Sequence, residues 1–367
     1  MRRYLLFSVM VVCLLTACKK EEPEVRTYPT SYNFENVNFS GQTSRIKMLS
    51  ELVTAMGKGT TEEVLAEKLL NMYANSGNPF TDASLNSSGK QLKDKTFALD
   101  IPMFEDYMSK LAANSLLRTQ IASHGVAGVA TSTTDATKKY LVDSNGVEYA
   151  QIIQKGLMGA IFYYRIADEY TTSAKLDVAN NTTVVPGEGT VRQHYWDEGF
   201  GYWGVPTYAN YDNYDSVKTV SGFKFYGTYV EKGKAISLYK NLLYAFIQGR
   251  TAINEDNKTD RETAATSIRK NMELINACSA ISYLNQAAAN YDNYAVRCHA
   301  LSEGYGFILS LKYNSNRSIT IEEYNALLSE FKVNNKLSVQ HLSSTEIITL
   351  RDELSSIFDL DSVKNTL

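Results

Sequence analysis

The chain has 367 residues, of which 44% are hydrophobic and 21% are charged, and its formal net charge at pH 7 is −3. This composition is typical of an ordered globular protein and excludes a disordered or fibrous chain. The absence of a basic excess argues against a nucleic-acid-binding protein. The 25 tyrosines, against 14 phenylalanines and two tryptophans, indicate many amphipathic aromatic side chains, which suit a water-exposed chain with binding surfaces.

The first 17 residues have the pattern of a secretory signal peptide. Arg2 and Arg3 provide the positive region, and residues 5–17 form an apolar stretch that is too short for a membrane-spanning helix. The stretch ends in Leu15-Thr16-Ala17-Cys18, which resembles the lipobox of bacterial lipoproteins. We therefore expect cleavage before Cys18, acylation of its side chain, and anchoring of the mature chain to membrane lipid.

A short charged segment, residues 19–24, follows the expected lipidation site and is interpreted as a solvated tether. Its Lys-Lys-Glu-Glu-Pro-Glu sequence also resembles the signals that send Bacteroidetes lipoproteins to the outer face of the outer membrane. The expected location is therefore the outer membrane, facing the cell surface or the periplasm. An outer-membrane receptor is a candidate partner, and no nucleic-acid partner is expected.

Hydrophobic residues recur mostly with helical spacing, so we predict an all-α fold with long loops. Capping residues followed by acids mark helix starts, as in Thr60-Thr61-Glu62-Glu63 and Thr320-Ile321-Glu322-Glu323. One short β-hairpin is predicted, with strands 140–142 and 147–149 joined through the turn-forming pair Asn145-Gly146. The predicted helices cover residues 43–57, 61–75, 101–123, 148–172, 190–204, 231–254, 260–289, 292–312, 320–333 and 344–358, and the predicted loops cover 76–99, 173–189 and 205–230.

Two segments share the pattern Arg-x-His-x-x-x-Glu-Gly-aromatic-Gly-aromatic. The first runs from Arg192 to Tyr202 and the second from Arg297 to Phe307. Two of the four histidines occupy the same place in this pattern, so duplication of a helical unit explains it better than chance. We predict two related bundles of four-helix type, over residues 41–205 and 231–367. The tyrosine-rich loop 206–230 would connect them, and the signal peptide 1–17 and the N-terminal segment 18–40 would precede them.

The His and Glu of each copy are four residues apart and therefore lie on one face of a helix. If the two helices met about a pseudo-twofold axis, the two pairs would converge, and two imidazoles with two carboxylates suit iron or zinc. The alternative is that each pair is a buried ion pair that orients helices, with the neighbouring Trp196 in the core. The candidate ligand-binding residues are His194, Glu198, His299, Glu303 and Trp196, of which the first four are also candidate metal ligands.

Small residues mark places where helices are expected to pack closely. A glycine inside a helix costs about 1 kcal/mol relative to alanine, so the repeated glycines need a compensating contact. We expect another helix or a bound ligand to approach them closely. Lys155 is expected to extend its charged end into water. The glycines in question are Gly199, Gly201, Gly304 and Gly306 in the repeat, and Gly156 and Gly159 after Lys155.

Two cysteines, Cys278 and Cys298, remain in the part of the chain that is expected to fold. In an oxidising compartment they would be able to form a disulfide if their Cα atoms lay within about 7 Å. Two buried free thiols are an equally acceptable interpretation.

With these residues in view, the chain resembles the imelysin-like superfamily of bacterial envelope proteins, and within it the Bacteroidetes lipoproteins grouped as domain of unknown function 4856. The resemblance lies in residues 28–34, 78–80 and 149–160 and in the motif of residues 196–202. It implies two related four-helix bundles and an association with iron uptake. Imelysins have a Gly-x-His-x-x-Glu motif, whereas here the His and Glu are four residues apart and Arg192 stands in place of the glycine.

The predicted function is a non-enzymatic, imelysin-like envelope lipoprotein that binds iron, haem or a partner receptor. One alternative is a metal-dependent hydrolase of the imelysin type, and another is a structural module of an outer-membrane uptake complex. The sequence contains no His-Glu-x-x-His helix, no Gly-x-Ser-x-Gly elbow and no glycine-rich phosphate loop. These absences favour a binding protein over an enzyme.

Overall fold

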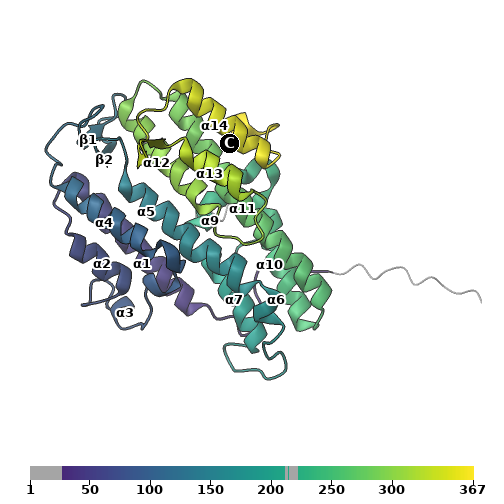
Figure 1. The fold of residues 1–367 in the computed structure, drawn as a ribbon. Helices are drawn as coiled ribbons and strands as arrows, with labels where there is room; N and C mark the ends of the chain where they lie inside the picture. Colours follow the sequence, from purple (N-terminus) through teal and green to yellow (C-terminus); the bar gives the residue numbers. More distant parts are fainter. Residues whose placement is uncertain (1–26, 211–213, 215–221) are drawn as a thin grey trace, which may run out of the picture.

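Helices form most of the protein, which confirms the predicted all-α class (Figure 1). The computed structural model describes residues 27–210, 214 and 222–367. The helices in these ranges are α1 (Ser40–Gly57), α2 (Ala66–Ala74), α3 (Ala83–Asn86), α4 (Ile101–Ser115), α5 (Tyr149–Leu157), α6 (Ser173–Leu176), α7 (Val191–Trp203), α9 (Tyr226–Tyr229), α10 (Leu238–Asn254), α11 (Lys258–Ala289), α12 (Tyr294–Ser310), α13 (Ile321–Ser329) and α14 (Ser344–Ile357).

The helix starts follow the capping residues at three places. Thr190, Thr320 and Ser343 each accept a hydrogen bond from the backbone three residues later, and a Gln or Glu at that position bonds back to the cap. The expected start at residue 61 is wrong, because α2 begins at Ala66. The backbone N–H of Val64 donates instead to the hydroxyl of Ser115, which fixes this segment to the end of α4.

The helix predicted over residues 148–172 is not uniform. After α5 the chain continues through two π-helical stretches, η4 (Met158–Tyr163) and η5 (Ile166–Tyr170). The glycines expected to allow close packing do so, because a Cβ at Gly156 would lie 2.7 Å from the ring of Phe104 and one at Gly159 would collide with Ser310. This stretch therefore contacts α4 on one side and α12 on the other.

The predicted hairpin is wrong in its pairing. β2 (Lys139–Val142) pairs antiparallel with the preceding β1 (Gly128–Thr131) rather than with residues 147–149. Asn145-Gly146 does form a turn, but Asp143 Oδ1 accepts hydrogen bonds from the backbone N–H groups of Asn145 and Val147, so the chain leads directly into α5. The predicted helix 101–123 ends at Ser115, because the segment that follows it bonds to β1.

A second ladder, β3 (Lys332–Val333) with β4 (Lys336–Leu337), was not predicted. Its turn residues Asn334 and Asn335 have φ values of 51° and 61°, which asparagine tolerates better than most residues. The helix predicted over 320–333 therefore ends at Ser329.

The helices pack around α5, which lies between α1 and α4 on one side and α12 on the other (Figure 1). α11 contacts α10, α12 and α14, and the buried apolar side chains form one continuous core. The division into two domains stays a prediction. Among the described residues, no helix combines the length and the apolar character needed to cross a bilayer.

Candidate functional site

The His-Glu pair of the second repeat copy belongs to a buried charged cluster. His299 Nδ1 lies 2.6 Å from Glu148 Oε2, and its Nε2 lies 3.4 Å from Glu303 Oε2. The ammonium of Lys155 lies 2.7 Å from the other oxygen of Glu303, and the ring of Tyr140 stacks on the imidazole with centroids 4.1 Å apart. The cluster therefore joins β2, α5 and α12.

The electrostatics of the cluster favour its charged forms. Burial lowers the pKa of His299, but the carboxylates of Glu148 and Glu303 outweigh this effect and raise it overall. Burial raises the pKa of Glu303, but the charges of Lys155 and His299 together outweigh that effect and lower it. With His299 protonated, two positive groups balance two carboxylates, so the cluster is an internal ion-pair network.

Lys155 is buried, with 1% of its side chain exposed, so the expectation of a surface lysine is wrong. Its ammonium also donates to Gln151 Oε1 at 2.9 Å and lies 5.1 Å from the ring centroid of Tyr229. A Cβ at Gly306 would lie 2.6 Å from the Cβ of Lys155. The second glycine of the motif therefore allows α5 and α12 to approach closely, as predicted.

The first repeat copy, on α7, has different partners. Glu198 Oε1 accepts a hydrogen bond from Gln42 Nε2 at 2.7 Å, and Gly201 packs on the side chain of Phe39. Within the described residues, Nδ1 of His194 is buried and has no hydrogen-bond partner. The His-Glu pair of this copy therefore has no counterpart of the charged cluster around Glu303.

The charged centre of the first copy is Asp197, which the sequence analysis missed. Its Oδ1 accepts hydrogen bonds from the Tyr32 hydroxyl at 2.6 Å and from Arg250 Nε at 2.9 Å, and both Asp197 and Arg250 are buried. Burial raises the pKa of Asp197 to about 6, although Arg250 acts in the opposite direction. In the sequence, Arg250 within the predicted apolar helix 231–254 was the one feature that indicated a buried ion pair.

The two His-Glu pairs have different partners, so the described residues give no support to the predicted iron or zinc site. α7 packs mainly against α1, α10 and η5, whereas α12 packs mainly against α5 and α11, and both also contact η4. Both carboxylate oxygens of Glu303 are already paired, one with Lys155 and the other with His299. In the ranges that the structure describes, no group of three or more His, Cys, Asp and Glu side chains could hold a metal ion. The four residues concerned are His194, Glu198, His299 and Glu303.

Trp196 belongs to the core and is not a ligand contact. Its side chain is fully buried, its Nε1 donates to the carbonyl of Phe246 at 2.9 Å, and a Cβ at Gly249 would collide with its ring. Cys278 and Cys298 are free thiols, and burial raises the pKa of each to about 12, so both are inert at neutral pH. The predicted lipidation site Cys18 lies outside the described residues.

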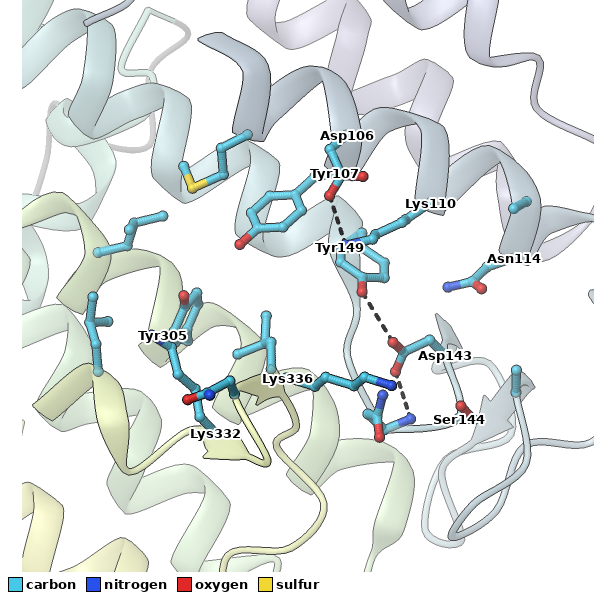
Figure 2. A pocket seen from close by; sticks show the side chains of 18 of the residues that line it. Asp106, Tyr107, Lys110, Asn114, Asp143, Ser144, Tyr149, Tyr305, Lys332 and Lys336 are labelled. Carbon is cyan, nitrogen blue, oxygen red and sulfur yellow. Dashed lines mark hydrogen bonds and ion pairs between the residues drawn. The ribbon is translucent and has the colours of Figure 1, made fainter. Parts of the chain in front are cut away.

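A pocket of about 1060 Å³, which we call the tyrosine pocket, lies between α4, the start of α5, α12, α13 and β4 (Figure 2). No sequence pattern indicated it, because it is assembled from segments far apart in the chain. Its lining includes Met103, Asp106, Tyr107, Lys110, Asn114, Asp143, Tyr149, Tyr305, Leu309, Tyr324, Leu328, Lys332 and Lys336.

Tyrosines form the walls of this pocket. The rings of Tyr107 and Tyr149 lie 5.4 Å apart, and Tyr305 faces Tyr107 from the opposite wall (Figure 2). The Tyr149 hydroxyl donates to Asp143 Oδ2 at 3.1 Å. Burial raises the pKa of Tyr107 and of Tyr305. Both phenols therefore stay neutral at physiological pH, and the hydroxyl of Tyr305 donates to that of Tyr107.

The charged residues of the pocket differ in whether they are already paired. Lys110 lies 2.7 Å from Asp106, and Lys312 lies 2.6 Å from Asp100 outside the lining. Lys332 and Lys336, at the rim, form no ion pair within the described part of the chain. The pocket therefore presents unpaired cations at its edge and neutral phenols on its walls.

No curated protein and no solved structure shows significant similarity to this chain. The model of a family described as a domain of unknown function, DUF4856, matches residues 29–360. This range contains both repeat copies, the charged cluster and every residue that lines the tyrosine pocket. The chain therefore belongs to the DUF4856 family.

Proposed function

We propose that the protein is a lipid-anchored binding protein of the cell envelope that holds a small organic ligand in the tyrosine pocket. The observation that carries this proposal is the pocket itself. Its volume of about 1060 Å³ is at the upper end of small-molecule sites, and its lining of aromatic and apolar side chains with a few polar groups is typical of such sites.

The envelope location is supported by the N-terminal sequence alone. Arg2, Arg3 and the apolar stretch before Cys18 form the pattern of a lipoprotein signal. An association with iron uptake rests on the imelysin-like resemblance. The second His-Glu pair belongs to the charged cluster, and Glu198 of the first pair is bonded to Gln42. A role in iron uptake would therefore depend on an organic metal complex or on a partner receptor. The buried and paired Glu303 gives no support to the hydrolase alternative.

We expect labelled palmitate to enter the protein at Cys18 when it is produced in a bacterial host that processes lipoproteins. The Cys18→Ala variant should lose both the label and its membrane association, because the acyl chains provide the anchor. Cys13→Ala is the matched control, since this cysteine lies inside the cleaved signal, and it should keep both. A Cys18→Ala protein that stays labelled and membrane-bound would contradict the anchor.

We expect a small organic compound to purify with the mature chain from its own cells and to be released on denaturation. The Ala113→Trp variant places an indole inside the pocket from an exposed position of α4, so it should release at least tenfold less of this compound. Ala136→Trp, at an exposed position outside the pocket, is the control and should behave like the unmodified protein. The same compounds in equal amounts from all three proteins would count against the binding function.

A further inference from the structure

We propose that the ligand of the tyrosine pocket is an organic anion that carries a ring, with its acidic group at Lys332 and Lys336 and its ring against the tyrosine walls. This inference rests on the proposed binding function and specifies the chemical class of the ligand. It follows from the hydrogen-bonding capacity that the lining residues leave unused.

Both carboxylates that line the pocket are already engaged. Oδ1 of Asp143 accepts from two backbone N–H groups, and its Oδ2 accepts from the Tyr149 hydroxyl. Asp106 is paired with Lys110 at 2.7 Å. A cationic ligand would have to displace one of these partners, whereas an anionic ligand would not.

The donor groups, by contrast, have capacity to spare. The Tyr305 hydroxyl donates to the Tyr107 hydroxyl, which leaves the O–H of Tyr107 available to a ligand, and the amide of Asn114 lies in the same lining. Lys332 and Lys336 add two ammonium groups without an ion-pair partner in the described ranges. Two ammonium groups without an ion-pair partner favour a ligand that carries negative charge.

The two lysines lie on the β3–β4 hairpin and not on a long flexible loop. Lys332 pairs with Leu337 across this ladder, and the N–H of Ser338 donates to the carbonyl of Phe331 at 2.8 Å, which closes the base of the hairpin. The backbone at both lysines is therefore held in place at one edge of the pocket. Both side chains are exposed, so each ammonium lies at the edge of the pocket and is accessible to a ligand.

The remaining lining accounts for the ring. Tyr107 and Tyr149 present two adjacent aromatic surfaces, and the apolar side chains of Met103, Leu309 and Leu328 complete the walls. Burial of a ring among these side chains is favourable because it removes apolar surface from water. A small inorganic anion would leave most of this space unfilled, so the inference is limited to organic anions.

The test uses two dyes with the same aromatic core and different charge, on the mature chain. 8-Anilinonaphthalene-1-sulfonate carries a sulfonate, and N-phenyl-1-naphthylamine is its neutral counterpart. We expect the anionic dye to bind at least tenfold more tightly than the neutral dye. The Lys332→Gln/Lys336→Gln variant should bind the anionic dye about tenfold more weakly. Its affinity for the neutral dye should change less than twofold. Raising the salt from low to high concentration should weaken only the anionic dye.

Two controls separate the possible failures. Lys68→Gln/Lys139→Gln removes two exposed lysines outside the pocket and should leave both affinities unchanged, and Ala113→Trp should weaken both dyes. One outcome would overturn the anion inference and leave the binding function standing. In that outcome the two dyes bind with equal affinity, Ala113→Trp weakens the binding of both, and the Lys332/Lys336 variant changes neither affinity. Dye affinities that Ala113→Trp leaves unchanged would remove the pocket as a binding site, and both proposals with it.

Discussion

Arg250→Met is expected to lower the free energy of unfolding at pH 7 by about 3–5 kcal/mol, the range for breaking one side of a buried ion pair. The substitution leaves the buried carboxyl of Asp197 with only the Tyr32 hydroxyl as a partner. That carboxyl must then stay charged without its cation or take up a proton. Urea denaturation monitored by circular dichroism measures the change.

The pH dependence separates this explanation from a simple loss of packing. The folded-state pKa of Asp197, about 6, is already above its ordinary value and rises further without Arg250. A raised folded-state pKa means that stability is highest at low pH and falls as pH rises toward that pKa. The difference between the variant and the unmodified protein should therefore be smaller at pH 5 than at pH 7. An equal difference at both pH values would contradict the role of Asp197.

Two further variants test the same pair. Arg250→Met/Asp197→Asn removes both charges, so it should recover more than half of the stability lost in the single variant. Lys58→Met removes a cation from the exposed pair Lys58–Glu62, and its unfolding midpoint should stay within error of the unmodified protein. If the exposed and the buried substitutions had similar effects, burial would not be the cause.

Lys155→Met is expected to destabilise the protein by about 3 kcal/mol or more, because it leaves Glu303 buried with only His299 as a charged partner. Methionine has nearly the same length as the lysine stem, so little packing is lost. Lys155→Met/Glu303→Leu should be substantially more stable than Lys155→Met, since both charges are gone. Thermal unfolding followed by calorimetry ranks the stabilities of the variants. If the double variant were no more stable than Lys155→Met, the ion pair would not be the cause of the destabilisation.

The duplicated motif provides a matched control for this prediction. Glu198 occupies the position of Glu303 in the first copy, but its partner is the neutral amide of Gln42. Glu198→Leu removes one hydrogen bond and should cost about 1–2 kcal/mol, less than Glu303→Leu, which leaves the ammonium of Lys155 buried and unpaired. A larger effect at Glu198 than at Glu303 would reverse our assignment of the charged cluster to the second copy.

The sequence was sufficient to locate the two helices of the motif and the close approach at Gly306, because both depend on local spacing. It was not sufficient to predict what faces each motif. Periodicity places His299 and Glu303 on one side of α12, yet the neighbour that fills that side, Lys155, lies almost 150 residues earlier. Its position depends on how α5 packs, and a lysine in an apolar helix is usually exposed.

The tyrosine pocket could not be predicted for a related reason. Its walls depend on where α4 and α13 end, and helix ends are the least certain part of a sequence-based prediction. Both helices are shorter than expected, ending at Ser115 and Ser329. Residues 330–333, which the predicted helix would have included, lead instead into β3 and carry Lys332.

The two π-helical stretches after α5 lie in the segment that packs on the first motif. Tyr170, at the end of η5, faces Gly199 of the first motif, just as Tyr283 on α11 faces Gly304 of the second. The two tyrosine-bearing segments are thus structural equivalents, but each π-helical turn takes up an additional residue that the regular α11 does not contain. An ungapped sequence alignment of the two halves therefore places non-equivalent residues opposite each other outside the motif. An alignment that places single-residue gaps within 158–163 and 166–170 is therefore the one that tests whether the helices beside the two motifs are related.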